Sequence, residues 1–137
     1  MNIIYEELIK LLERSYKNDD VPVAAIVTKN NKIISKGYNT RNKSHEVTAH
    51  AEINAINKAC KKLHQTFLYD CDLYVTLKPC EMCKQVIKSA RINKVYYLID
   101  KLPEKKEYNK TIFEQVTNNY SEKSKLILKK FFLKKRH

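Results

Sequence analysis

The pattern of apolar positions changes from helical to strand-like within the N-terminal third of the chain. In the first 17 residues, leucines and isoleucines recur every three or four positions, which predicts an amphipathic helix. The run Val21–Val27 is short and wholly apolar, so it predicts a buried strand. A polar turn follows, and residues 33–38 then predict the returning strand of a hairpin. Gly37, the single glycine, predicts a bulge or a close backbone approach in that strand.

Helical and strand-like patterns alternate along the rest of the chain. The expected elements are a loop at 39–47, a helix at 49–63 capped by Thr48, a strand at 72–77, a helix opened by Pro79, a strand at 94–99, a short helix at 112–116 and a last helix at 121–133. Such alternation after a hairpin predicts a layered α/β fold, with a partly parallel sheet and helices on both faces. The sequence shows no repeat and no boundary, so we expect one domain over 1–137, with 102–109 its only linker-like stretch.

Composition and charge restrict the class of protein and its partners. Hydrophobic residues make up 43% and charged residues 31%, which is typical of a folded globular chain rather than a disordered one. No apolar run reaches the roughly 20 residues of a membrane span, and no signal peptide is visible, so we expect a cytoplasmic protein. The net charge of +12 suggests a polyanionic partner such as nucleic acid, although lysines that merely fill solvated positions would give the same charge.

Two short motifs carry the candidate chemistry. Of four cysteines, Cys80 and Cys83 are separated by two residues and preceded by Pro79, which favours metal or redox chemistry over disulfides. His50 and Glu52 form a His-x-Glu pair, which is a weak signal alone. Both motifs fall at the starts of predicted helices, where ligand sites form in α/β sheets.

The spacing of these residues predicts a zinc site. Cys80 and Cys83 lie on one face of a helix's first turn, whose positive end stabilises their thiolates. With His50 as third ligand, the soft donor set favours Zn²⁺ and leaves a fourth position for water, as in catalytic sites. Glu52 would then take a proton from that water. A dithiol redox pair and a structural zinc with an unidentified fourth ligand are the alternatives, and Cys60 and Cys71 are expected to be small buried apolar residues.

Taken together, the two motifs form the signature of zinc nucleobase deaminases. Further matching segments are Val-Pro-Val-Ala-Ala at 21–25, Gly-Tyr-Asn at 37–39, Thr-Ala-His-Ala-Glu-Ile at 48–53, Leu-Tyr-Val-Thr-Leu at 73–77 and Ala-Arg-Ile at 90–92. Over nearly its whole length, the chain therefore resembles the bacterial-type tRNA-specific adenosine deaminases, which have the cytidine-deaminase-like fold. This resemblance implies a three-layer α/β/α sandwich, with a central mixed sheet of about five strands and helices on both faces.

The resemblance also implies a reaction and a set of roles. The reaction is hydrolytic deamination of the wobble adenosine of a tRNA anticodon to inosine, with one zinc ion per subunit held by His50, Cys80 and Cys83. Glu52 would protonate N1 of the base and then the departing ammonia. Asn39 would hydrogen-bond the flipped adenine. The remaining implied features are Val23 packing against the base, a homodimer, and a basic C-terminal helix at about 121–136 that lies against the anticodon stem-loop through Phe131, Phe132, Lys134, Lys135 and Arg136.

Some positions depart from the family's pattern, and other functions stay open. Lys78 stands where an acidic residue is usual, Val47 replaces a frequent proline, and Glu81 is an unusual acid beside the cysteines. A zinc-dependent deaminase of a free base or nucleoside, of guanine, cytosine or cytidine type, would share the metal motif. A non-catalytic zinc-containing RNA-binding subunit is the alternative from another class, although it would have no need of Glu52.

Overall fold

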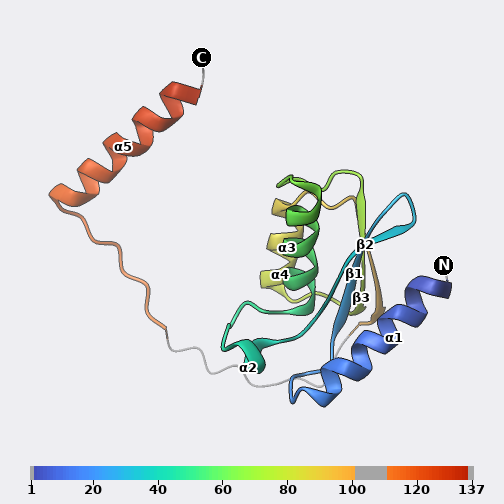
Figure 1. The fold of residues 1–137 in the computed structure, drawn as a ribbon. Coiled ribbons are helices and arrows are strands. Elements are labelled where there is room, and N and C mark those ends of the chain that lie inside the picture. The colour runs from blue at the N-terminus through green and yellow to red at the C-terminus, as the bar shows by residue number, and fades with distance from the viewer. Residues whose placement is uncertain (1, 101–110, 136–137) are drawn as a thin grey trace. The chain divides into compact units, whose positions relative to one another are not determined.

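The computed structural model describes residues 2–100 and 111–135. The chain divides into two compact units, Met1–Pro103 and Glu104–His137, and each is described by itself. The first unit contains a sheet and four helices, and the second contains one helix (Figure 1). The expectation of one domain over the whole chain stays a prediction.

The sheet of the first unit is mixed, as expected from the sequence. Its strands are β1 (Ala24–Lys29), β2 (Lys32–Tyr38), β3 (Cys71–Leu77) and β4 (Lys94–Ile99), in the order β2-β1-β3-β4. Strand β1 is antiparallel to both β2 and β3, whereas β3 and β4 are parallel. Four strands are present in the described residues, where about five were expected. Because β1 and β3 run in opposite directions, the start of β1 lies beside the end of β3.

Helices cover both faces of this sheet, which confirms the layered fold (Figure 1). The helices of the first unit are α1 (Asn2–Lys17), α2 (Arg41–Ser44), α3 (Ala51–Leu63) and α4 (Glu81–Ser89). The alternation of side chains along β1 explains the two layers: Ala24 and Ile26 pack with α1, whereas Ala25 and Val27 face the core formed with α3 and α4. Both sets are buried, which explains why the sequence of this strand is a nearly continuous apolar run.

Gly37 allows helix α3 to lie directly against strand β2. A Cβ atom at this position would lie 2.6 Å from the carbonyl oxygen of Ala51 and 2.7 Å from the nitrogen of Ala55. Two positions earlier, the Ser35 hydroxyl donates a hydrogen bond of 2.7 Å to the Ala55 carbonyl oxygen. The close approach expected at Gly37 is therefore confirmed, and it fixes the helix that carries the candidate site.

Several expected element boundaries were wrong. The loop at 39–47 contains the one-turn helix α2. Helix α3 has His50 rather than Thr48 as its N-cap, because the backbone is still in turns there, with the Ala49 amide bonded to the Glu46 carbonyl. Helix α4 has Cys80 as its N-cap, so Pro79 precedes the helix instead of opening it. The linker-like stretch 102–109 lies outside the described residues.

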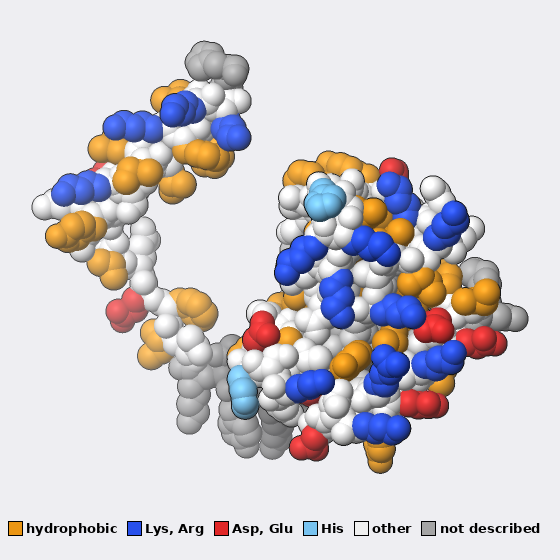
Figure 2. All heavy atoms as spheres, viewed as in Figure 1, with side chains coloured by type: hydrophobic (Ala, Val, Ile, Leu, Met, Phe, Trp, Pro, Cys, Tyr) orange, Lys and Arg blue, Asp and Glu red, His pale blue; other side chains and the backbone are white. Residues whose placement is uncertain are grey.

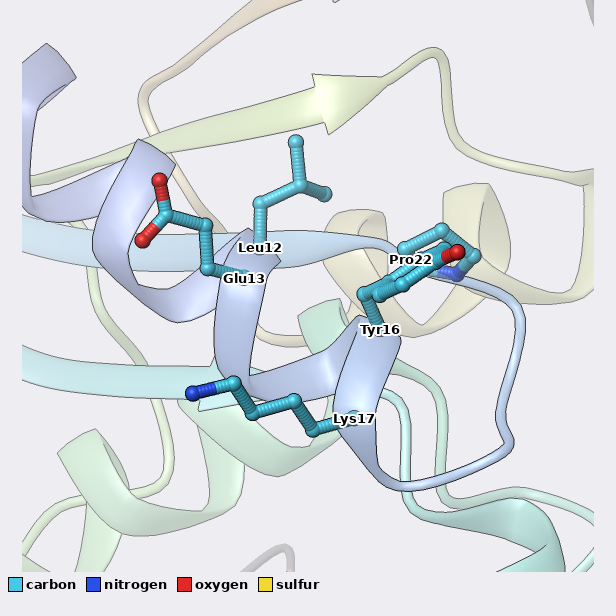
Figure 3. Close-up of a pocket in the computed structure, with 5 residues that line it drawn as sticks. All are labelled: Leu12, Glu13, Tyr16, Lys17 and Pro22. Carbon is cyan, nitrogen blue, oxygen red and sulfur yellow. The ribbon is translucent and has the colours of Figure 1, made fainter.

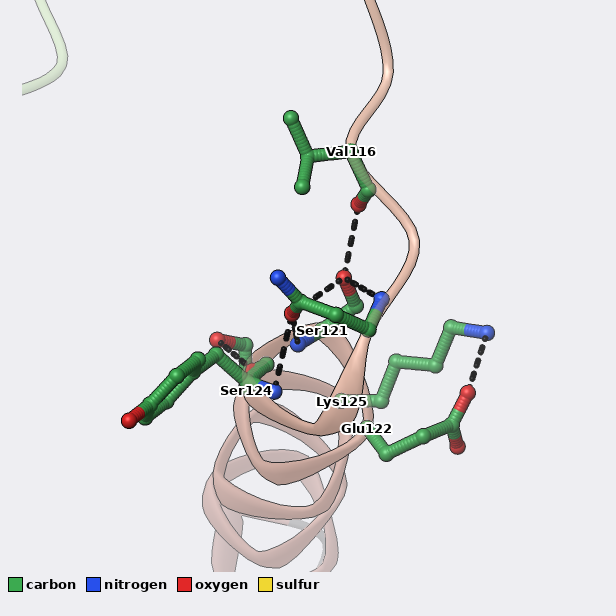
Figure 4. Close-up of polar contacts among 7 residues, drawn as sticks. Val116, Ser121, Glu122, Ser124 and Lys125 are labelled. Atoms are coloured by element: carbon green, nitrogen blue, oxygen red, sulfur yellow. Dashed lines mark hydrogen bonds and ion pairs between the residues drawn. The ribbon is translucent and has the colours of Figure 1, made fainter.

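The second unit contains helix α5, which spans Asn119–Lys135. Residues 112–116, where a short helix was expected, are not helical. The Asn118 side-chain oxygen accepts hydrogen bonds from the amides of Tyr120 and Ser121, and the Ser121 hydroxyl donates to the Val116 carbonyl (Figure 4). These bonds satisfy amides that the first helical turn leaves unpaired. Across residues 2–100 and 111–135, no helix combines the length and apolar character needed to cross a membrane.

Candidate active site

The starts of helices α3 and α4 bring three potential metal-binding side chains together at one end of the strands. His50 is the N-cap of α3, Cys80 is the N-cap of α4, and Cys83 lies in the first turn of α4. Their ligand atoms all lie within 4.8 Å of one another. The His50 Nδ1 atom is 3.8 Å from the Cys80 sulfur and 3.3 Å from the Cys83 sulfur. The three ligands predicted from the sequence therefore form one cluster.

The geometry of this cluster fits a tetrahedral zinc ion. Zinc bonds of about 2.3 Å to sulfur and about 2.0 Å to nitrogen imply a sulfur-to-nitrogen separation of about 3.5 Å at the tetrahedral angle. The two separations in the structure, 3.8 and 3.3 Å, lie on either side of that value. In addition, the positive N-terminal ends of α3 and α4 favour thiolates at this position. The donors of the cluster can thus hold Zn²⁺, with one coordination position left for a non-protein ligand.

The protonation of the cluster follows from its burial. Burial lowers the pKa of His50, and the positive charge of Arg41 lowers it further, so the imidazole is held in the neutral form that binds metal. Cys83 is fully buried. Burial raises the pKa of its thiol, and the nearby Glu52 carboxylate and Cys80 raise it further. A bound cation would offset these effects, because it stabilises the thiolate.

Glu52 lies in the first turn of α3, beside the metal cluster. Its side chain is only 4% exposed and interacts with Cys83. Burial raises its pKa, while hydrogen bonding from its own backbone amide and from Cys83 acts in the opposite direction. Within residues 2–100 and 111–135, Glu52 is not among the residues grouped as metal donors. A buried carboxyl group with a raised pKa next to a metal site can accept a proton and return it.

Asn39 links the loop before β1 to the start of α3. Its Nδ2 atom donates a hydrogen bond of 2.9 Å to the Val21 carbonyl oxygen, and its Oδ1 atom accepts one of 2.8 Å from the Ala51 amide. Its backbone amide donates to the Val23 carbonyl oxygen at 3.2 Å. Each side-chain atom retains one further hydrogen-bonding position. Asn39 and Val23 are both buried, so their expected contacts with a base stay predictions.

Two positioning residues were missed by sequence reasoning. The Asn54 side chain donates to the Tyr38 carbonyl oxygen and the Thr40 hydroxyl, which ties α3 to the loop around α2. Asp20, interpreted from sequence only as part of a helix-breaking segment, is buried and accepts a hydrogen bond from the Asn42 amide. The sequence offered one signal for Asn54, which is a polar residue one helical turn after His50. No sequence pattern indicated the contact of Asp20 with Asn42.

The expected RNA-contacting residues lie on helix α5, apart from Arg136, which is outside the described residues. Phe131 and Phe132 are 52% and 61% exposed, and their rings form an edge-to-face pair. The Lys135 ammonium lies 5.7 Å from the centre of the Phe131 ring. Lys134 is also exposed. An exposed surface of this kind suits a nucleic-acid partner, but the assignment of these residues stays a prediction.

The remaining cysteines do not join the cluster. All four cysteines are free. Cys71 is fully buried in the core between the sheet and α3, as expected, whereas Cys60 is half-buried at its margin. Burial raises the pKa of both thiols, which is the behaviour of small apolar residues rather than reactive ones.

Comparison with known proteins identifies relatives that are named for adenosine deamination. The chain is 44% identical over 85 residues to a tRNA-specific adenosine deaminase of Aquifex aeolicus. It is 32% identical over 143 residues to the enzyme of that name from Rickettsia typhi, covering 96% of this chain and 97% of the relative. The similarity to tRNA-specific adenosine deaminases inferred from the motifs is thus confirmed. The matched part spans 56% of the A. aeolicus relative's length.

Solved structures show the same fold. A tRNA:A34 deaminase superposes with a TM-score of 0.66 at 36% identity, over 70% of this chain and 72% of that protein. A guanine deaminase from Bacillus subtilis superposes with a TM-score of 0.78 at 28% identity, over 91% of this chain and 90% of that one. The family model described as MafB19-like deaminase matches residues 1–136. The chain therefore belongs to the MafB19-like deaminase family.

Proposed function

We propose that this protein hydrolyses the exocyclic amino group of the wobble adenosine in a tRNA anticodon, producing inosine and ammonia. The observation that carries the proposal is the buried Glu52 carboxyl group beside a three-donor cluster of His50, Cys80 and Cys83. A purely structural zinc site needs a fourth protein donor and no proton carrier. The arrangement is therefore suited to hydrolysis rather than to structure.

The roles of the residues follow from their positions. When bound, zinc would supply a water molecule activated for attack at neutral pH. Glu52 would accept a proton from that water and deliver it to N1 of the adenine. It would then take the proton of the hydroxyl group added at C6 and pass it to the amino group, which leaves C6 as ammonia. Asn39 would use its remaining donor and acceptor positions to orient the base, and Val23 would pack against the base from the start of β1.

The RNA substrate is supported by charge and by the relatives. The chain carries 27 basic and 15 acidic residues, and Lys and Arg side chains are spread over the face of the first unit seen in Figure 2. A free base has no phosphates for such a surface to neutralise. The relatives from A. aeolicus and R. typhi are named for tRNA. In an unpaired anticodon loop, the target base also leaves the stack at lower cost than in a duplex.

We propose a homodimer that acts in the cytoplasm. Strand β4 is at the edge of the described sheet and exposes Tyr97, Leu98 and Ile99, each by about half. An edge strand that exposes apolar side chains is available for contact with another protein chain. The four free cysteines and a tRNA substrate suit a reducing compartment.

Deamination of guanine is the second candidate, because the B. subtilis guanine deaminase superposes over 91% of this chain. The two functions differ in one physical respect, since guanine binding uses no phosphate contact and is insensitive to counterion release.

An incubation of zinc-loaded protein with transcribed arginine tRNA, and in parallel with free guanine, cytosine and cytidine, separates the two functions. We expect inosine at the wobble position, detected by sequencing. Ammonia release from a free base without inosine in the tRNA would refute the proposed function.

A further inference from the structure

One pocket is lined by residues that have no assigned role in the reaction. It has a volume of about 420 Å³ and is lined by Leu12, Glu13, Tyr16, Lys17 and Pro22, which we call the Tyr16 pocket. Figure 3 shows that four of these residues come from the last turns of α1, and that Pro22 comes from the segment leading into β1. The volume is in the range of pockets that bind small ligands.

The Tyr16 pocket is connected to the active site through the segment before β1. The Val21 carbonyl oxygen accepts hydrogen bonds from the Ser15 hydroxyl of α1 at 3.5 Å and from the Asn39 side chain at 2.9 Å. Asn39 in turn accepts from the Ala51 amide, next to His50. Because β1 is antiparallel to β3, this segment also lies at the end of the strands where β3 leads into Cys80. The segment that contributes Pro22 to the pocket is therefore the same one that is hydrogen-bonded to Asn39 and, through it, to the start of α3.

The chemistry of the Tyr16 pocket suits a nucleobase. Tyr16 is 76% exposed, so its ring is free to stack on a planar ligand. Leu12 and Pro22 provide apolar walls, and the Glu13 carboxylate can accept hydrogen bonds from exocyclic amino groups. Lys17 supplies a positive charge beside the pocket, which suits the phosphate attached to a bound nucleotide.

We propose that the Tyr16 pocket binds an unpaired nucleobase adjacent to the deaminated one in the same RNA strand. This inference rests on the proposed function and adds a substrate contact to it. An RNA strand whose bases are splayed apart would place one base at the metal cluster and a neighbouring base against Tyr16, on the other side of the segment before β1. Bases of single-stranded RNA are recognised by stacking on aromatic side chains in this way.

Binding to an anticodon stem-loop RNA, measured by fluorescence anisotropy with zinc-loaded protein, tests the proposal. Tyr16→Ala is expected to raise Kd about 5- to 100-fold, the loss of one stacked base. Tyr16→Phe keeps the ring and is expected to stay within about twofold of the original protein. The matched control is Tyr69→Ala, since Tyr69 is 59% exposed and lies just before β3, whose start is beside the end of β1 and so at the opposite end of the strands from Pro22. Zinc content and thermal unfolding confirm that each variant is folded.

RNAs with one abasic nucleotide beside the wobble position identify the base concerned. When the base that occupies the pocket is missing, Tyr16→Ala and the original protein should bind with equal Kd. The inference would be overturned if Tyr16→Ala and the original protein bound with different Kd values on every abasic RNA. It would also be overturned if Tyr16→Ala and Tyr69→Ala had the same Kd, and the pocket would then be available to another ligand, such as a protein. If the original protein deaminates the RNA, such a result leaves the proposed function intact. If it neither binds nor deaminates RNA, both proposals fail.

Discussion

At the scale of single residues, Glu52 is the side chain that distinguishes a reactive centre from a structural one. Its carboxyl group is 4% exposed, and burial of an ionisable group costs free energy that an apolar residue would not. Burial raises the pKa of the neighbouring Cys83 thiol, and the Glu52 carboxylate raises it further. These costs have no benefit for the fold, whereas a proton carrier requires them.

Substitution Glu52→Ala is expected to abolish deamination while zinc and tRNA binding persist. Removal of a general acid–base group typically costs 100-fold or more in turnover. Turnover is measured as inosine formation, zinc by metal analysis, and binding by anisotropy. The matched control is Glu81→Gln, since Glu81 is exposed in the first turn of α4 and forms an ion pair with Lys84 on the same helix. Undiminished turnover of the Glu52 variant would refute its assignment.

Asn39 makes a structural contribution that is separable from any contact with a base. Substitution Asn39→Ala removes one of the two hydrogen bonds to the Val21 carbonyl and leaves the buried Ala51 amide without its side-chain partner. A buried unsatisfied group costs about 1–3 kcal/mol, so we expect a loss of that size in the free energy of unfolding, measured with urea. Asn42→Ala serves as control, because its side chain makes only an exposed hydrogen bond to Asp19. Equal stabilities of the two variants would contradict this role of Asn39.

At the scale of elements, periodicity predicted which helices and strands exist, but not where they begin. Thr48 fits the usual preference for an N-cap, yet the turn that precedes α3 extends to His50. Backbone hydrogen bonds stabilise such turns, and the pattern of apolar and polar residues does not predict those bonds. Residues 112–116 contain apolar side chains at spacings that suit a helix, but their structure is not helical, and a segment this short carries too little periodicity to decide.

The cluster of candidate metal donors could be predicted because the spacing of these residues is a local property of two helix starts. His50, Cys80 and Cys83 are recognisable as motifs, and the sheet then brings those helix starts together. Asn54 and Asp20 were missed because their partners are carbonyl and amide groups of distant loops. Contacts between a side chain and a distant backbone group have no sequence signature.

Gly37 is the residue on which the packing of two elements depends. In Gly37→Ala, the new methyl group would meet the backbone of α3 at 2.6–2.7 Å, so helix and strand must separate. Overpacking of this kind costs about 1–3 kcal/mol, and it moves Ala51, next to His50. We therefore expect a lower melting temperature and weaker zinc retention, measured by calorimetry and metal analysis. The control is Asn57→Ala, on the exposed side of α3, which should change neither the melting temperature nor zinc retention. Unaltered stability of Gly37→Ala would contradict the prediction, because α3 and β2 would then accommodate the methyl group without cost.

At the scale of the whole molecule, the net charge of +12 acts on the rate and strength of association rather than on the fold. Helix α5 concentrates exposed lysines and exposed aromatic rings on one element, and none of its described residues is buried. A helix that buries no apolar face within its own unit gains its stability elsewhere, by contact with a partner or with other protein surface. An RNA stem-loop is the partner that its charge favours.

Truncation after Lys130 tests that contribution of the basic end. It removes Phe131 and Phe132 together with three cations, so tRNA affinity should fall, and the slope of log Kd against log salt should decrease by about 2. Affinity is measured by anisotropy at several KCl concentrations. The double variant Lys61→Gln and Lys88→Gln removes charges from the last turns of α3 and α4, away from the metal cluster, and should leave the slope nearly unchanged. If the truncated chain keeps both affinity and slope, these lysines are a solvated surface, and the charge that attracts RNA lies on the first unit.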